Sequence, residues 1–139
     1  MNKTLALIKP DAVKRNIIGD IISLIEKNGF TVKDIKFMKM SQSIAEKFYE
    51  AHIGKSFYDK LVSYMTSGSI VALILEKDNA VETFRDLIGS TDPELAKEGT
   101  IRKLYAIDKS FNSVHGSDSL DNAQKEISFF FAETELFES

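Results

Sequence analysis

The amino-acid sequence predicts an α+β fold, in which helices cover an antiparallel sheet built in the order βαββαβ. Three observations lead to this prediction. Strand-like and helix-like segments alternate along the chain, residues 70–75 form an apolar run typical of a central strand, and residues 89–114 lack clear periodicity. The chain has 139 residues and 43% apolar residues, enough for one core, so we expect residues 1–139 to form a single domain.

The first part of the chain is expected to fold as strand, helix and strand. Residues 4–8 have the composition of a buried strand, and Pro10 after them suits the first position of a helix. Isoleucines at positions 18, 21, 22 and 25 mark one face of a helix, which Gly29 can end in a left-handed conformation. Residues 31–40 then predict a second strand.

Two short helices and a central strand are expected next. Ser43 and Glu46 have the spacing of a capping box, which predicts a helix that begins at Ser43 and reaches at least Tyr49. Residues 57–65 predict another short helix, with apolar residues at helical spacing. Residues 70–75 are apolar on both faces and therefore predict the central strand.

The helix after the central strand is expected to begin at Asn79, which can cap it, and to end at Gly89. Its predicted inner side carries Val81, Phe84 and Ile88. The segment from 89 to 114 fits either a surface loop with a short helix that the pattern does not reveal, or a loop that covers a site or an interface.

A short strand and a final helix are expected to complete the fold. Residues 119–131 predict this helix, with Leu120, Ala123, Ile127 and Phe130 or Phe131 on its inner side. The whole order suits a ferredoxin-like sheet with helices against one face and a long loop before the strand that carries His115.

The composition excludes several classes of protein. The chain has no cysteine, which excludes a disulfide scaffold, thiolate metal sites and a cysteine nucleophile, and which suits a cytoplasmic location. Its net charge of −3 argues against a dedicated nucleic-acid binder. No apolar run is long enough to span a membrane, so we expect a soluble protein without a membrane partner.

His115 is the more promising of the two histidines, although a single histidine is more often a packed or surface residue than a catalyst. Gly116 removes side-chain bulk beside its ring, and Asn112, Ser117 and Asp118 are expected to place hydrogen-bonding groups around it. On the following helix, Glu126 is expected to reach back and orient the imidazole. The two histidines lack the spacing of a metal site, and the sequence has neither a P-loop nor a nucleophile elbow.

Three basic residues could bind an anion, but the sequence pattern does not show that they converge. Lys9 follows the first strand, Arg85 lies on an amphipathic helix, and Arg102 lies in the long segment beside Thr100. Taken singly, each is more often a solvated charge or a helix cap.

Residues 112–119, Asn-Ser-Val-His-Gly-Ser-Asp-Ser, resemble the active-site signature of the nucleoside diphosphate kinases, Asn-x-x-His-Gly-Ser-Asp-Ser. The resemblance extends from position 4 to about position 131, with further matching segments in the family's order and spacing. These are Ile8-Lys9-Pro10-Asp11, Phe48-Tyr49, Met65-Thr66-Ser67-Gly68, Arg85-Asp86-Leu87 and Gly99-Thr100-Ile101-Arg102.

The resemblance implies a nucleoside diphosphate kinase that maintains nucleoside triphosphate pools. Such an enzyme moves the γ-phosphoryl group from a nucleoside triphosphate, mainly ATP, to a nucleoside diphosphate by a ping-pong route. His115 would attack through Nδ1 and carry the group as a phosphohistidine. An imidazole suits this role because a large fraction of it is unprotonated near neutral pH.

The family pattern also implies roles for other residues. Lys9 and Asn112 would contact the ribose, and Lys9 also the transferring phosphoryl group; His52 would lie near the α-phosphate. Phe57 would stack on the base, while Glu126 and Ser117 would hold His115. The implied catalytic set is His115, Lys9, Glu126, Tyr49 and Ser117. The implied nucleotide-binding set is Lys9, His52, Phe57, Arg85, Thr91, Arg102 and Asn112. Of these, Arg85, Thr91 and Arg102 would hold the β- and γ-phosphates.

The implied cofactor is Mg²⁺, which would arrive on the nucleotide phosphates without a direct protein ligand, with Asp118 touching it through water. The implied assembly is a homo-oligomer, either a tetramer or a hexamer. The sequence departs from the family's usual residues at several loop positions, none of which removes a catalytic group: Ser56, Ser69, Glu98, Lys103, Leu104 and Lys109.

An alternative function is a non-catalytic nucleotide-sensing or scaffolding module of the same fold. The two hypotheses differ in one observable, because only the enzyme would exchange phosphoryl groups between ATP and a nucleoside diphosphate.

Overall fold

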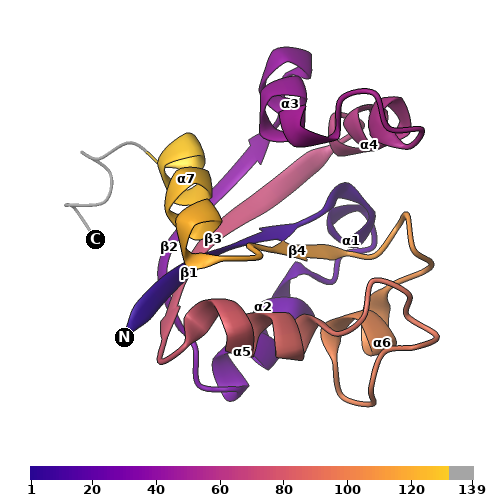
Figure 1. The fold of residues 1–139 in the computed structure, drawn as a ribbon. Helices are drawn as coiled ribbons and strands as arrows, with labels where there is room; N and C mark the ends of the chain where they lie inside the picture. Colours follow the sequence, from indigo (N-terminus) through magenta and orange to yellow (C-terminus); the bar gives the residue numbers. More distant parts are fainter. Residues whose placement is uncertain (132–139) are drawn as a thin grey trace.

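The computed structural model describes residues 1–131. In this part of the chain, four antiparallel strands form one sheet in the order β2-β3-β1-β4 (Figure 1). The strands are β1 (Asn2–Ile8), β2 (Thr31–Lys39), β3 (Ser69–Lys77) and β4 (Val114–Gly116). This sheet confirms the predicted antiparallel α+β fold, with residues 70–75 on a central strand.

Helices pack on both faces of this sheet (Figure 1), so the expectation of helices against one face is wrong. Both faces need cover because β1 and β3 are apolar on both sides: Ala6 and Ile8 join one core cluster, whereas Leu5 and Leu7 join the other. The first cluster packs against α1 (Pro10–Lys14), α2 (Ile18–Lys27), α5 (Ala80–Ile88) and α6 (Ile101–Tyr105), and the second against α3 (Gln42–Phe48), α4 (Tyr58–Met65) and α7 (Leu120–Phe130).

Several predicted helix boundaries agree with the structure. Helix α1 begins at Pro10, and Gly29, with φ of +88°, follows the end of α2 in the left-handed region. Asn79 occupies the N-cap position of α5, although its side chain makes no capping hydrogen bond. Ser119 caps α7 by accepting a hydrogen bond from Asn122 N at 3.1 Å.

Two local predictions are wrong. Helix α3 begins at Gln42 rather than Ser43, because the hydroxyl of Ser41 accepts a hydrogen bond from Ile44 N at 3.2 Å and caps the helix earlier. Leu120 is exposed rather than on the inner side of α7, since it stands at the first position of the helix, at the rim of the core.

The segment from 89 to 114 contains a helix that the sequence pattern did not reveal. Thr100 caps the five-residue helix α6 by accepting a hydrogen bond from Lys103 N at 3.3 Å. The helix agrees with the first of the two interpretations of the segment, without excluding the second, and it places Arg102 on a helix rather than in a loop. A short 3₁₀ helix, η1 (Glu50–His52), lies between α3 and α4. None of the helices within residues 1–131 is long and apolar enough to cross a membrane.

Thr4 is fully buried in β1, and its hydroxyl has no hydrogen-bond partner among residues 1–131. A buried hydroxyl without a partner is destabilising, so the isosteric change Thr4→Val is expected to raise the free energy of unfolding by about 1 kcal/mol. Urea denaturation at neutral pH measures this change. As a matched control, Thr100→Val removes a hydroxyl that donates to Lys97 O at 2.7 Å, and it should lower stability instead. A loss of stability in Thr4→Val would contradict the expectation.

Candidate active site

His115 lies in the middle of β4, opposite Leu7 of β1. The next residue, Gly116, lets the strand approach helix α5 closely. A Cβ atom at this position would lie 2.9 Å from side-chain atoms of both Phe84 and Ile88. Any larger residue would therefore push the strand outward and move His115 away from α5.

The imidazole of His115 is held by α7. Its Nε2 lies 2.9 Å from Oε1 of Glu126, which also accepts a hydrogen bond of 2.6 Å from the hydroxyl of Ser117. Because an ionised carboxylate only accepts hydrogen bonds, Nε2 carries the proton and Nδ1 keeps its lone pair. Phe48 packs edge-on against the ring, with 5.5 Å between the centroids. The expected contact between Glu126 and His115 is therefore present.

Tyr49 directly follows α3, and its side chain is buried. Its hydroxyl has no hydrogen-bond partner among residues 1–131. Burial and the negative charge of Glu126 raise the pKa of this hydroxyl, which therefore stays protonated and able to donate. Next along the chain, His52 stacks on Tyr49 and packs against Phe57, with centroid distances of 6.4 and 5.3 Å. These rings form an aromatic row on the connection between α3 and α4, and Phe57 is half exposed.

Lys9 is a buried cation at the junction of β1 and α1. Its Nζ donates to Asn112 Oδ1 at 2.8 Å, so these two predicted site residues lie side by side. Burial, together with the charge of Arg102, lowers the pKa of the Lys9 ammonium from 10.5 to about 8. The negative charge of Asp11 offsets this effect only in part, and Lys9 forms no ion pair within residues 1–131. A buried lysine without an ion-pair partner is costly, which makes Lys9 a candidate for binding an anion.

Arg85 and Arg102 lie on the two sides of His115 along β4. Nη1 of Arg85 lies 3.4 Å from Gly116 O, and Nη2 of Arg102 donates to Val114 O at 2.9 Å. Burial and the charge of Arg85 lower the pKa of Arg102, whose Nε is buried without a partner in the described part of the chain. The structure thus brings Arg102 close enough to both Lys9 and Arg85 for their charges to repel, which the sequence pattern could not show.

The remaining predicted residues are less closely tied to His115. Asn112 binds Lys9, and the carboxylate of Asp118 accepts a hydrogen bond from Asn122 Nδ2 at 2.5 Å. Within residues 1–131, neither side chain forms a hydrogen bond with the His115 ring. Thr91 is exposed in the loop after α5 and makes no side-chain hydrogen bond within residues 1–131. Within the same residues, no group of three or more histidine or acidic side chains could hold a metal ion.

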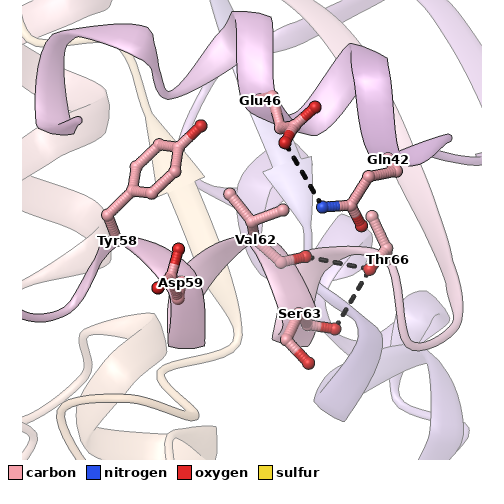
Figure 2. Close-up of a pocket in the computed structure, with 7 residues that line it drawn as sticks. All are labelled: Gln42, Glu46, Tyr58, Asp59, Val62, Ser63 and Thr66. Atoms are coloured by element: carbon pink, nitrogen blue, oxygen red, sulfur yellow. Dashed lines mark hydrogen bonds between the residues drawn. The ribbon is translucent and has the colours of Figure 1, made fainter. Parts of the chain in front are cut away.

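An open pocket between α3 and α4 lies elsewhere (Figure 2). Across it, Gln42 and Glu46 of α3 face Val62 and Ser63 of α4 and Thr66, which directly follows α4. No residue that lines it belongs to the predicted site, so the candidate active site is the polar cluster around His115.

Sequence reasoning missed two features of this cluster. Phe48 packs on His115, and the only sequence feature that pointed to it was its position next to Tyr49. Asp11, Arg15 and Ser113 form a hydrogen-bonded network beside Lys9. Asp11 and Arg15 have the i,i+4 spacing of a helical ion pair, but no spacing rule links them to the distant Ser113.

Comparison with known proteins identifies the family of this chain. The family model "Nucleoside diphosphate kinase" matches residues 2–136. The chain belongs to the nucleoside diphosphate kinase family. The nucleoside diphosphate kinase of Histophilus somni (strain 2336) is 53% identical over 137 residues, covering 99% of this chain and 97% of that protein.

Solved structures of nucleoside diphosphate kinases share the fold. The enzyme from Aquifex aeolicus has a TM-score of 0.93 at 36% identity, covering 96% of this chain and 97% of that one. The enzyme from Halobacterium salinarum, in complex with CDP, also has a TM-score of 0.93, at 39% identity, covering 96% of this chain and 90% of that one. The protein is therefore a phosphotransferase that acts between nucleoside triphosphates and nucleoside diphosphates.

Proposed function

We propose that this nucleoside diphosphate kinase transfers the γ-phosphoryl group by a ping-pong route through a phosphohistidine on His115. The observation that carries the proposal is the bond between His115 Nε2 and Glu126 at 2.9 Å, which leaves the lone pair on Nδ1. His115 is also partly exposed, with 22% of its side-chain surface accessible, so a phosphate can reach the ring.

The proposed reaction has two symmetric steps. Nδ1 of His115 attacks the γ-phosphorus of the donor triphosphate, the bond from that phosphorus to the β,γ-bridging oxygen breaks, and the diphosphate leaves with the electron pair. A terminal oxygen of a second diphosphate then attacks the phosphohistidine, and the N–P bond breaks to restore the neutral imidazole. Glu126 and Ser117 hold the ring in one orientation throughout, and Glu126 stabilises the positive charge that develops on it.

The cations around His115 have the chemistry that phosphoryl transfer needs. Arg85, Thr91 and Arg102 would hold the β- and γ-phosphates, and Lys9 would contact the transferring phosphoryl group. The three cations would stabilise negative charge on the moving group. Arg102 repels both Lys9 and Arg85, and its Nε has no partner among residues 1–131; both observations support this role, because a polyanion would relieve the repulsion and accept a hydrogen bond from Nε. The hydroxyl of Tyr49, also without a partner in the described residues, would donate to the same group.

The other nucleotide contacts follow the same arrangement. Phe57 would stack on the base, His52 would lie near the α-phosphate, and Lys9 and Asn112 would contact the ribose. The exposed face of Phe57 and the hydrogen bond between Lys9 and Asn112 support these roles. The complex of the Halobacterium salinarum relative with CDP supports a nucleoside diphosphate as ligand.

Mg²⁺ is proposed to enter with the nucleotide phosphates, whose charge it neutralises. Asp118 fits a water-mediated contact with it: the carboxylate is exposed, and a hydrogen bond from Asn122, aided by the charge of Arg85, lowers its pKa and keeps it ionised. Mg²⁺ prefers oxygen ligands and keeps several bound waters, which can donate hydrogen bonds to a carboxylate.

Initial-rate kinetics test the proposed route. With Mg-ATP as donor and GDP as acceptor, a ping-pong mechanism predicts parallel double-reciprocal lines as the fixed acceptor concentration varies. Intersecting lines would contradict it, since they require both nucleotides to be bound together. A folded wild-type protein without any exchange would instead favour the nucleotide-sensing or scaffolding alternative.

The pH dependence of the reaction is expected to report on Lys9. The pKa of about 8 means that the ammonium is charged below that pH and neutral above it, so kcat/KM should fall as pH rises through about 8. Bound phosphates favour the charged form, so the fall in kcat should begin at a higher pH. Replacement of lysine by arginine, which stays charged, should abolish this fall in kcat/KM. An unchanged profile in Lys9→Arg would contradict the assignment.

We also propose that residues 1–139 act as a single domain in the cytoplasm and assemble as a homo-oligomer. The absence of cysteine supports a reducing compartment. The proposed assembly rests on β2, which lies at the edge of the sheet in residues 1–131. Two apolar residues of this strand are exposed: 52% of the surface of Ile35 and 64% of that of Phe37 are accessible. An exposed edge strand with apolar side chains suits pairing with the same strand of a second copy.

The change Phe37→Glu is expected to disrupt this assembly, because it would place two carboxylates near the axis that relates the copies. Light scattering after size exclusion measures the mass: we expect four or six chains for the wild type and fewer for the variant. A wild-type monomer, or a variant of unchanged mass, would contradict the proposed interface.

A further inference from the structure

Ser113 lies in a strained backbone turn two residues before His115. Its φ is +72°, which residues with a side chain rarely adopt, and Val114 N donates to Asn112 O at 2.9 Å across it. A hydrogen bond between residues i and i+2 around a positive φ marks the strained form of the γ-turn. Such strain persists only where the surrounding structure holds the residue in place.

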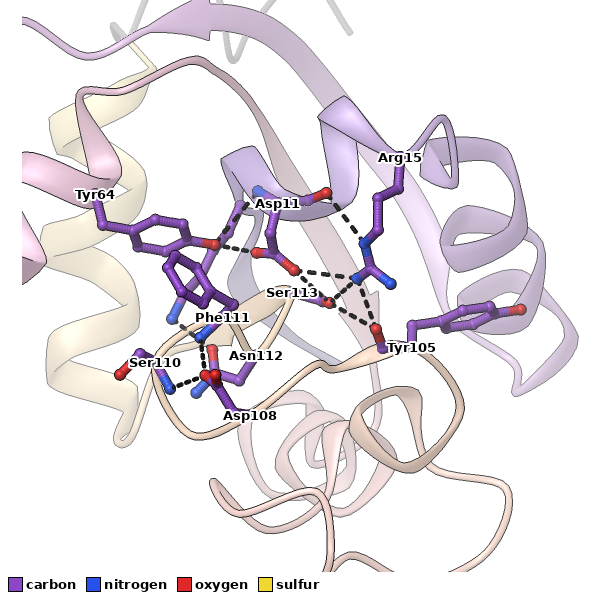
Figure 3. Close-up of polar contacts among 10 residues, drawn as sticks. Asp11, Arg15, Tyr64, Tyr105, Asp108, Ser110, Phe111, Asn112 and Ser113 are labelled. Atoms are coloured by element: carbon purple, nitrogen blue, oxygen red, sulfur yellow. Dashed lines mark hydrogen bonds and ion pairs between the residues drawn. The ribbon is translucent and has the colours of Figure 1, made fainter.

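Side chains from separate segments hold this turn (Figure 3). Ser113 is fully buried, and its Oγ donates to Asp11 Oδ2 at 2.8 Å. Nη2 of Arg15 lies 3.0 Å from Ser113 Oγ, 3.1 Å from Asp11 Oδ2 and 2.6 Å from Tyr105 O. On the other side, the hydroxyl of Tyr64 donates to Asp11 Oδ1. The buried carboxylate of Asp11 is thus the common acceptor of three donors, which makes it the centre of the network.

The turn connects two parts of the active site. Before it, Asn112 accepts a hydrogen bond from Lys9 Nζ, and Lys9 N donates to Ser113 O at 2.8 Å. After it, the chain enters β4 and His115 follows two residues later. The conformation of a single residue therefore sets the direction of Asn112 and Lys9 relative to the imidazole.

We propose that Asp11 and Arg15 are positioning residues that hold the γ-turn at Ser113 and, through it, align Lys9 and Asn112 with the imidazole of His115. This inference rests on the proposed phosphohistidine mechanism, in which Lys9 and His115 act on the same phosphoryl group. A displacement of about 1 Å at a reacting group can lower a rate roughly 100-fold. We therefore expect the network to act mainly on the chemical step, and on the affinity for the nucleotide only through the ribose contacts of Lys9 and Asn112.

Substitutions at Ser113 separate the hydroxyl from the backbone strain. Ser113→Ala loses the bond to Asp11 but keeps the strained φ, so we expect phosphoenzyme formation to slow roughly 10- to 100-fold. Ser113→Gly also loses the hydroxyl, but glycine adopts positive φ without strain, so most of the rate should return. The measurement is the single-turnover rate of phosphoenzyme formation on mixing with Mg-ATP, and the KM for ATP should change much less than the rate.

Arg15→Met provides a second variant; 37% of this side chain is accessible, so we expect the variant to fold. It should slow the same step roughly tenfold, with little change in KM. Ile25→Val, on the buried face of α2, lowers stability without touching the network and should leave the single-turnover rate unchanged.

Three results would overturn the inference: wild-type rates in Ser113→Ala and Arg15→Met, a loss confined to KM, or a Ser113→Gly variant as slow as Ser113→Ala. Failure of the underlying mechanism has a different signature, since the wild-type protein itself would then form no phosphoenzyme.

Discussion

Replacement of His115 by asparagine is expected to lower the exchange of phosphoryl groups between ATP and GDP by roughly 10⁴-fold or more, because it removes the proposed nucleophile. Asparagine keeps a polar side chain of similar reach but has no basic lone pair to form the N–P bond. The ring is partly exposed and its hydrogen-bonding contact is with Glu126, so the substitution should leave the fold intact. Steady-state exchange and thermal unfolding measure the two properties separately.

The other histidine supplies a matched control. His52 stacks on Tyr49 and contacts Lys55 rather than Glu126, so His52→Asn should still become phosphorylated on incubation with Mg-ATP. Exchange that persists in His115→Asn, or phosphorylation that disappears only in His52→Asn, would refute the assignment of the nucleophile.

The change Lys9→Met is expected to lower exchange by roughly 10²- to 10³-fold, the usual cost of losing one preorganised donor to developing negative charge. Methionine has a similar length and no charge, so it tests the ammonium rather than the space it fills. The same change should leave the unliganded protein at neutral pH at least as stable as the wild type, since it removes a buried cation that faces Arg102.

The effect of Lys9 on stability has a defined pH dependence. Its pKa is about 8 in the folded protein and 10.5 in the unfolded chain, so the destabilisation is fully present below pH 8 and fades as pH rises toward 10.5. The difference in melting temperature between Lys9→Met and the wild type should therefore shrink over this range. If activity and stability instead fall together at neutral pH, Lys9 is a structural residue and its proposed role is wrong.

The sheet and most helices could be predicted from the sequence because each depends on local patterns. The apolar run at 70–75 and the isoleucines from 18 to 25 specify a buried strand and one helix face without any tertiary information. Helix α6 could not be predicted in the same way, because its five residues are too few to establish periodicity. Nor does periodicity say on which face of the sheet a helix packs.

The chemistry of the site could be predicted only in part. The signature around His115 and the distant Glu126 led to a correct expectation of their contact. The convergence of Lys9, Arg85 and Arg102 depends on the order of strands in the sheet and on α6, so no sequence spacing indicates it. The strained turn at Ser113 gave no signal, because serine is not a residue type that marks positive φ.

The most direct measurement is the intact mass of the wild-type protein after brief incubation with Mg-ATP and no acceptor. We expect one covalent phosphoryl group per chain, lost in acid, stable in alkali, and passed quantitatively to GDP added afterwards. A protein that exchanges phosphoryl groups between ATP and GDP yet never carries one itself would contradict a phosphohistidine on His115.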